Sequence, residues 1–252
     1  MSAEIETLLE QADALYERGD AASLGKMVRL CERASAIGET LDPAVDAHRN
    51  ALTRAHRKLG FVRWTQNGPD ANAVSLAEWE QTIAIGETLD LSVAEYCNDL
   101  AGAYTNKGNT LQALGSPQAL QQALTAYDRA IALGETLDPS IAQYCTFLAN
   151  AYSNKGVALA ALGAPQALQQ AIAAHERAIA LRETLDPGVA EYCHDLARVY
   201  YNKALALLAA PDPMRAEDAA ETGLALLRDA ELGGIYHLRP TRERLFRLTL
   251  DA

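Results

Sequence analysis

The chain has 252 residues and a formal net charge of −11. A charge of this sign repels nucleic acid and anionic membranes, so neither is an expected partner. Hydrophobic residues make up 49% of the chain and aromatic residues only 6%. This composition is typical of closely packed helices and argues against a β-sandwich.

Three features of the sequence predict a cytoplasmic location. No apolar run is long enough to cross a bilayer, and the first residues, MSAEIETLLEQ, are acidic where a signal peptide would be basic. Four cysteines in a chain of this length do not form the disulfide framework of a small secreted domain.

Residues 1–37 predict a helical hairpin. Apolar residues recur at helical spacing from Leu8 to Tyr16 and again from Met27 to Ala34. Gly19 and Asp20 interrupt this pattern, so we expect the turn there.

A five-residue stretch, GETLD, begins at Gly38 and then recurs every 48 residues. It begins again at Gly86 and Gly134 and, with one change, at Arg182. A fixed period without insertions is typical of stacked repeats that share their buried faces. We therefore predict a single domain over 1–252, with a hairpin at 1–37, repeats at 38–85, 86–133, 134–181 and 182–229, and a C-terminal cap at 230–252.

Each repeat predicts two long antiparallel helices. In the second repeat we expect Asp90 to cap the first helix, whose apolar stripe runs to about Leu114. The sequence Gly115-Ser116-Pro117 then predicts the end of that helix and the start of the next.

The GETLD stretch itself predicts a joint between repeats. Because Arg182 replaces glycine at the first position, we expect that position to be helical. The leucine is expected to anchor the turn, and the aspartate to cap the helix that follows.

The last residues predict a short helix over about 239–250 that covers the end of the stack. Leu245, Phe246, Leu248 and Leu250 are expected to face the stack. The arginines Arg239, Arg242, Arg244 and Arg247 are expected to face water.

These repeats resemble tetratricopeptide repeats (TPR). That family carries a Leu-Gly-x-x-Tyr-x-x-x-Gly run in its first helix and an alanine, an aromatic residue and an alanine in its second. The second repeat here has Leu100, Ala101, Tyr104 and Gly108 at the first-helix positions, and Ala123, Tyr127 and Ala130 at the second-helix positions. The period of 48 residues departs from the family's usual period of about 34. Longer helices and a longer connection account for the excess.

The resemblance implies an all-α fold, a right-handed superhelical solenoid of about five antiparallel helix pairs plus the C-terminal capping helix. It also implies a concave groove that binds a peptide or protein segment, lined by set columns of the first helices. In the second to fourth repeats, the residues at those columns that are predicted to contact the partner are Asn98, Asn106, Asn150, Asn154, His194, Arg198, Tyr201 and Asn202.

The asparagines Asn106, Asn154 and Asn202 need a reason, because asparagine is a poor residue for the interior of a helix. An amide ladder offers a donor and an acceptor to the backbone of an extended peptide. Two alternatives stay open: the amides bridge adjacent helices, or they persist because the repeats arose by duplication.

The first helix of the first repeat is unusually basic. Residues 46–63 hold five Lys or Arg and one acid in an otherwise acidic chain. Arg54, Arg57 and Lys58 are predicted to form the end of the groove that accepts an acidic element of the partner. The alternative is an ordinary solvated helix face.

Cysteines occupy one column, at Cys97, Cys145 and Cys193. Equivalent positions on successive helices are about 8–10 Å apart, too far for a disulfide, so we expect small buried apolar side chains. Beside Cys193, Glu191 and His194 share a helix face, but zinc would need two more ligands and the other repeats do not complete such a set. We therefore expect neither a metal site nor a cofactor.

The sequence shows no phosphate-binding loop, paired catalytic carboxylates or serine–histidine–acid set. We therefore predict a protein that is not an enzyme but an interaction scaffold, which binds a protein or peptide in its groove. Two alternatives stay open, a structural module that assembles into a homo-oligomer and a regulator that senses a small ligand or peptide.

Overall fold

A computed structural model describes residues 2–16, 21–66, 70–231 and 247 of the chain. The chain divides into two compact units, unit 1 at residues 1–137 and unit 2 at residues 138–252, and each is described by itself. The described residues form ten α-helices and no strand. The predicted all-α class is therefore confirmed, whereas one continuous domain over 1–252 stays a prediction.

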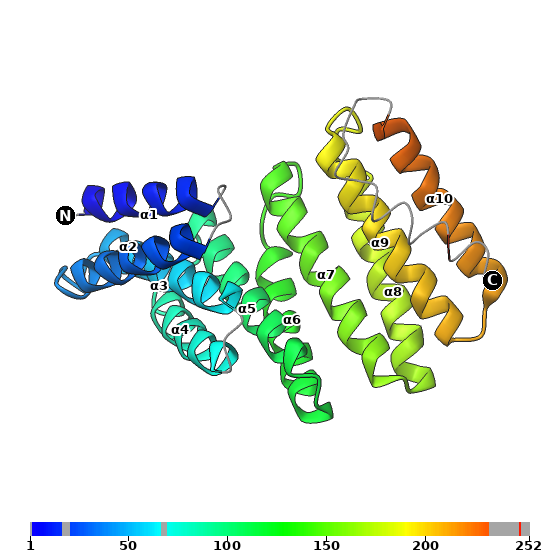
Figure 1. Cartoon of the computed structure of the whole chain (residues 1–252), viewed down its shortest axis with the longest axis horizontal. Helices are drawn as coiled ribbons and strands as arrows, with labels where there is room; N and C mark the ends of the chain where they lie inside the picture. The colour runs from blue at the N-terminus through cyan, green and yellow to red at the C-terminus, as the bar shows by residue number, and fades with distance from the viewer. Residues whose placement is uncertain (1, 17–20, 67–69, 232–246, 248–252) are drawn as a thin grey trace. The chain divides into compact units, whose positions relative to one another are not determined.

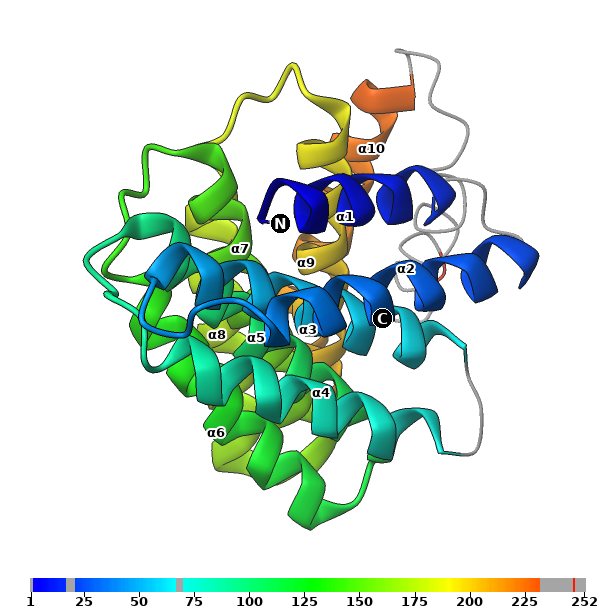
Figure 2. The same ribbon diagram turned by 90° about the vertical axis from the view of Figure 1, so that its left-hand side faces the viewer.

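Unit 1 contains three antiparallel helix pairs, and Figure 2 shows its first four helices side by side. The predicted N-terminal hairpin is confirmed, although its expected turn at Gly19 and Asp20 lies outside the described residues. The helices are α1 (Ser2–Tyr16), α2 (Ala21–Glu39), α3 (Asp46–Thr65), α4 (Ala71–Gly86), α5 (Ala94–Leu114) and α6 (Pro117–Gly134).

Unit 2 contains two further pairs, in which each helix packs on the next, as Figure 1 shows. The helices are α7 (Ala142–Leu162), α8 (Pro165–Arg182), α9 (Ala190–Ala209) and α10 (Pro213–Glu231). The predicted helix at 239–250 lies outside the described residues apart from Arg247, which is helical and exposed. We call the odd-numbered helices the first helices and the even-numbered ones the second helices.

The turns inside the pairs form as the sequence predicts. Gly115 and Gly163 have φ of 69° and 68°, the left-handed conformation that glycine adopts without steric cost. Ser116 then caps α6, because its hydroxyl accepts a hydrogen bond from the Ala119 N–H at 3.2 Å.

The joints between pairs repeat one hydrogen-bond pattern. The threonine hydroxyl of each GETLD stretch donates to the carbonyl three residues earlier at 2.7 Å, for example from Thr88 to Ile85. The leucines are buried, with exposed fractions between 6 and 9%. As predicted, the leucine anchors the joint, and Arg182 is the last residue of α8. The four leucines are Leu41, Leu89, Leu137 and Leu185.

The predicted capping role of the joint aspartates is wrong. The Asp90 carboxylate accepts from the Ser92 N–H at 3.0 Å, and α5 begins only at Ala94, after Val93, which makes no side-chain cap. The other three aspartates bond two residues on in the same way, at 2.8–2.9 Å. The side chain therefore closes a turn of its own before the helix begins, a local arrangement that competes with capping.

Three second helices pack a buried ring against a glycine of the first helix. Trp79, Tyr127 and His175 occupy equivalent positions 48 residues apart. A Cβ on the facing glycine would lie 2.5 Å from the Tyr127 ring at Gly108 and 2.6 Å from the His175 ring at Gly156. The missing side chain of glycine thus lets the two helices of a pair approach closely.

The polar atoms of two of these rings have partners. The Trp79 indole N–H donates to the Thr110 hydroxyl at 3.0 Å. The Tyr127 hydroxyl lies 2.9 Å from both the Asn109 and the Gln112 side-chain oxygens. Both rings therefore keep a satisfied polar group in an apolar core.

His175 has no such support. Both of its ring nitrogens are buried without a hydrogen-bond partner. The residues in place of Asn109 and Gln112 are Val157 and Ala160. Burial lowers the pKa of His175 to about 4, so the imidazole is neutral in the folded protein at neutral pH.

We expect Gly108→Ala to destabilise the protein by about 1–3 kcal/mol, because the new methyl group must displace the Tyr127 ring or α5. The control is Gly25→Ala in α2, where a Cβ would meet nothing within 4 Å. That change should stabilise the helix by up to about 1 kcal/mol. Urea unfolding of both variants measures the difference, and equal effects would contradict the proposed contact.

We expect acid to weaken unit 2 through His175. The pKa falls from 6.5 in the unfolded chain to about 4 in the fold, so the unfolded state binds more protons between these values and stability falls as the pH drops through this window. The loss between pH 7 and pH 5 should be about 2 kcal/mol.

The triple variant His175→Tyr, Val157→Asn, Ala160→Gln carries the Tyr127 arrangement into unit 2 and should lack this part of the pH dependence. Urea midpoints at the two pH values test it. An equal loss in the variant and the wild type would show that His175 is not the source.

Candidate functional site

The first helices of unit 1 are joined by ion pairs on the face where α1, α3 and α5 lie side by side. The Arg54 guanidinium lies 2.9 Å from the Glu6 carboxylate on α1 and 3.8 Å from Glu95 on α5. Lys58 forms an ion pair with Asp13 on α1. We call this surface the first-helix face of unit 1.

The most buried charge on this face is Asp99. Its side chain is 9% exposed, and its carboxylate lies 3.1 Å from the Arg57 guanidinium. Burial raises the pKa of Asp99, and the nearby Arg57 opposes that shift. Gly102 leaves room beside this pair, because a Cβ there would lie 3.6 Å from Arg57 Nη1.

Arg54, Arg57 and Lys58 therefore each have a carboxylate partner within unit 1. These ion pairs hold α3 to its neighbours, a role that the sequence pattern did not reveal. Their predicted role in binding an acidic element of a partner stays a prediction.

Two asparagines on the same face are buried with unused acceptors. Asn50 and Asn98 are 5% and 6% exposed, and the side-chain oxygen of each has no hydrogen-bond partner. A buried acceptor without a donor costs free energy, so both positions are places where a bound donor would stabilise the protein.

On the first-helix face of unit 2, where α7 and α9 lie side by side, the central charge is Arg182. The side chain is buried, and its guanidinium donates to the Asn150 oxygen at 2.7 Å and lies 3.0 Å from the Asp195 carboxylate. Arg198, which is half exposed, also contacts Asp195 at 3.2 Å. Two guanidinium groups thus share one carboxylate.

Arg182 is a site residue that the sequence analysis missed. It was interpreted only as part of a joint, because the three other joints have glycine there. That departure from the repeat was the available signal, since a long charged side chain in place of glycine must reach a new partner.

The remaining predicted groove residues lie on the first helices but are not brought into one cluster. Asn106, Asn154 and Asn202 are half-buried at equivalent positions, and His194 and Tyr201 are half-buried on α9. The lysines that follow two of these asparagines form ion pairs with the preceding second helix, Lys107 with Glu80 at 3.2 Å and Lys203 with Glu176 at 3.0 Å. Peptide binding by these asparagines stays a prediction.

The cysteine column behaves as predicted in two of its three members. Cys97 and Cys145 are 1% exposed, and their thiols donate to the carbonyls of Leu133 at 3.5 Å and Leu181 at 3.1 Å. Cys193 differs, because it is only half-buried and its thiol donates to the Pro187 carbonyl at 3.2 Å. All of these cysteines lie outside disulfides.

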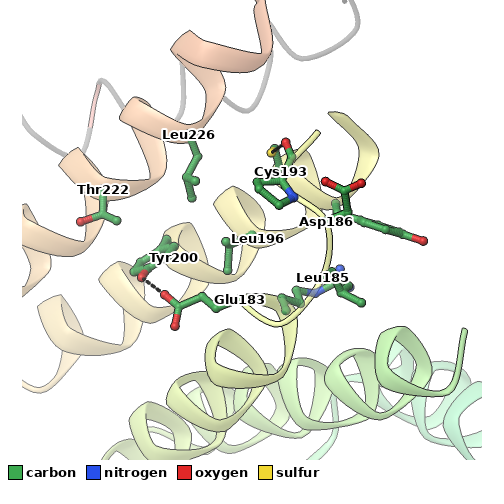
Figure 3. Close-up of a pocket in the computed structure, with 11 residues that line it drawn as sticks. Glu183, Leu185, Asp186, Cys193, Leu196, Tyr200, Thr222 and Leu226 are labelled. Carbon is green, nitrogen blue, oxygen red and sulfur yellow. Dashed lines mark hydrogen bonds between the residues drawn. The ribbon is translucent and has the colours of Figure 1, made fainter. Parts of the chain in front are cut away.

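A cavity of about 220 Å³ lies beside Cys193 and is shown in Figure 3. The joint supplies Leu185 and Asp186, α9 supplies Leu196, and α10 supplies Leu226. We call it the Cys193 pocket. It is lined by Arg182, Glu183, Leu185, Asp186, Pro187, Tyr192, Cys193, Leu196, Tyr200, Thr222 and Leu226.

The described part of the chain has neither a metal-binding cluster nor a membrane-spanning helix. Among those residues no three His, Cys, Asp or Glu side chains gather as a metal site would require. No helix within 2–16, 21–66 or 70–231 is both long and apolar enough to cross a membrane.

The described helix pairs match solved TPR-like proteins. BtubC (BKLC) from P. vanneervenii aligns with a TM-score of 0.60 at 18% identity, over 93% of this chain and 92% of that one. A kinesin-light-chain-like protein of Podosopora anserina with nearly identical TPR-like repeats aligns with a TM-score of 0.59 at 19% identity, over 89% and 97%. A point variant of that protein gives a TM-score of 0.57 at 19% identity, over 90% and 97%.

The chain thus has a TPR-like repeat fold, as its sequence predicts. No family model and no curated protein matches the chain. The identities to the solved structures are low, so these likenesses establish the fold and nothing about the partner.

In each of the two buried ion pairs, we expect that removing the more exposed partner costs more stability than removing the buried one. In unit 1 the buried member is Asp99, so Arg57→Met should cost about 3 kcal/mol and Asp99→Asn about 1 kcal/mol. In unit 2 the buried member is Arg182, so Asp195→Asn should cost about 3 kcal/mol and Arg182→Met about 1 kcal/mol.

Urea unfolding of the four single variants and the two double variants tests this order. The physical reason is that removing the exposed partner leaves a buried charge uncompensated. Equal costs for both members of each pair would contradict it.

Proposed function

We propose that the protein is a non-catalytic interaction scaffold that binds an extended segment of a partner protein on its first-helix faces. The observation that carries the proposal is the unused hydrogen-bonding capacity of these faces. The buried oxygens of Asn50 and Asn98 in unit 1, and of Thr146 in unit 2, have no partner within the protein. Backbone N–H groups of an extended peptide would satisfy such acceptors.

The half-buried asparagines support the same proposal. Asn106, Asn154 and Asn202 recur at one position of three first helices. An amide offers both a donor and an acceptor, as a peptide backbone does, so each can pair with a bound segment irrespective of its side chains. The TPR-like fold supports the general class of protein-interaction scaffold.

We expect the partner to bind unit 2 through an acidic side chain. Arg198 is half exposed and shares Asp195 with the buried Arg182, so this surface holds one more cation than its carboxylate neutralises. A carboxylate of the partner would bind the Arg198 guanidinium through charge-assisted hydrogen bonds. The cytoplasmic location expected from the sequence remains part of this proposal.

We expect the double variant Asn154→Ala, Asn202→Ala to bind a partner at least about tenfold more weakly, because each lost hydrogen bond contributes roughly 1 kcal/mol. The partner is captured from native lysate with the full chain, identified and purified, and its Kd is measured by calorimetry. The matched control is Gln169→Ala, Gln170→Ala, which removes two exposed amides from the second helix α8.

The control should change the Kd less than twofold. Equal losses in both variants, or none in either, would show that the partner does not bind the asparagine positions. A charge-reversal variant, Arg198→Glu, tests the acidic complement separately, since it should weaken binding only at low salt.

A further inference from the structure

A second cavity, of about 340 Å³, lies in unit 1 between the second helices α4 and α6 and beside the first helix α5. Leu76 on α4, Leu111 on α5 and Ala126 on α6 supply its apolar lining. Leu111 and Ala126 are only 5% and 4% exposed, so the floor of the cavity is apolar. Since a cavity of about 150 Å³ holds one benzene ring, this space is large enough for two rings.

The mouth of the cavity carries charged side chains. Arg129 on α6 and Glu80 on α4 have side chains that are 65% and 64% exposed, so both lie at the open side. The Lys107 ammonium on α5 lies 3.2 Å from the Glu80 carboxylate, and these two charges neutralise each other. The Arg129 guanidinium lies 6.0 Å from the centre of the Tyr104 ring, whose face attracts a cation. We call this cavity the Arg129 pocket.

Arg129 keeps part of its hydrogen-bonding capacity for a ligand. It forms an ion pair with Glu87 at 3.6 Å, and the same carboxylate oxygen accepts from the Tyr104 hydroxyl at 2.5 Å. The separation from Glu87 is longer than the roughly 2.7–2.9 Å of a charge-assisted hydrogen bond. A ligand carboxylate can therefore approach the N–H donors of this guanidinium more closely than Glu87 does.

Unit 2 repeats the contacts around this position. Two repeats later in the sequence, the Tyr200 hydroxyl donates to the Glu183 carboxylate at 3.1 Å, and Lys203 lies 3.0 Å from Glu176. These pairs are equivalent to the tyrosine and lysine pairs of the Arg129 pocket. Because both units have them, we assign them to the packing of the helices.

The charges of the lining differ between the two units. Three exposed lining residues of the pocket are replaced by two acids and an alanine at the equivalent positions of unit 2. The lining thus has a surplus of positive charge in unit 1 and of negative charge in unit 2, so only the Arg129 pocket suits an anion. The replaced residues are Gln122, Thr125 and Arg129, and those in their place are Asp218, Glu221 and Ala225.

We propose that the Arg129 pocket binds a small molecule that joins an apolar body of one or two rings to a carboxylate. The apolar body packs on Leu76, Leu111 and Ala126. The carboxylate lies at the mouth, where Arg129 binds it through two parallel hydrogen bonds and Lys107 adds a second positive charge. This inference is independent of the proposed function, because the lining residues are not among the asparagine positions of the first-helix faces.

Photochemical labelling of the full chain with para-benzoylbenzoate tests the proposal. This probe joins two aromatic rings, bridged by a photoreactive carbonyl group, to one carboxylate, and peptide mass spectrometry locates its adducts. Labelling of peptides from α4 and α5 should saturate as the probe concentration rises. The neutral probe para-benzoylbenzamide should need an at least about tenfold higher concentration for half-saturation, because it cannot form charge-assisted hydrogen bonds with Arg129.

The variant Arg129→Ala should raise the half-saturation concentration of para-benzoylbenzoate at least about tenfold and change that of the neutral probe less than about twofold. The matched control is Arg33→Ala, which removes an arginine of unit 1 that is 64% exposed and paired with Glu4. The control should change neither value. An equal shift in both variants would show a general effect of net charge and overturn the role of Arg129.

A triple variant, Gln122→Asp, Thr125→Glu, Arg129→Ala, gives the pocket the residues of unit 2. All three positions are exposed, so the variant should stay folded, which far-UV circular dichroism checks. It should keep its labelling by the neutral probe and lose saturable labelling by para-benzoylbenzoate. If wild-type α4 and α5 peptides carry no saturable adduct, or if para-benzoylbenzoate labels the triple variant as efficiently as wild type, the proposal is overturned.

Discussion

The close approach of one repeat to the next at the joint is the constraint on which the rest of the structure depends. A Cβ at Gly38 would lie 2.8 Å from a side-chain carbon of Leu52, and one at Gly86 would lie 2.9 Å from Leu100. These contacts are shorter than Cβ atoms tolerate, so glycine at these two joints lets the second helix of one pair lie this close to the first helix of the next. The buried leucine and the threonine hydroxyl then fix the path of the chain around that contact.

The fourth joint carries a long side chain at this position, and this links the fold to the candidate site. Arg182 stands where glycine stands elsewhere, and its side chain extends to Asn150 and Asp195 on the two neighbouring first helices. A departure from the repeat at a purely structural position therefore changes the charge of a surface. The repeats keep one scaffold, and single residues within them give each face its own chemistry.

The sequence predicted the features that depend on local chemistry and on the repeat period. The glycine turn at Gly115, the cap at Ser116 and the burial of Leu89 follow from residues within one segment and are confirmed. Asp90 was assigned the wrong role, because the hydrogen bonds of an N-cap and of a local turn call for the same residue type. The partners of Arg57 and Arg182 could not be predicted, since they lie on other helices and the repeat pattern does not show which side chains meet between helices.

The division of the chain into two units was also invisible in the sequence. The 48-residue register continues through residues 137 and 138 without any insertion, deletion or change of composition that would indicate a boundary. A repeat period reports that neighbouring segments have the same internal structure. It does not report how strongly successive copies hold each other.

The rings that face glycine within the helix pairs bear on how such a chain evolves. Gly108 fits Tyr127 and Gly156 fits His175. The equivalent positions of the last pair are Ala204 and Gly223, small residues on both helices. Recombination that joined α9 to α6 would press a methyl group into a tyrosine ring, and joining α5 to α10 would leave a void. Whole pairs can be duplicated or exchanged without either fault. The last pair can therefore be exchanged with the others only as a whole, because neither of its helices fits a single helix of those pairs.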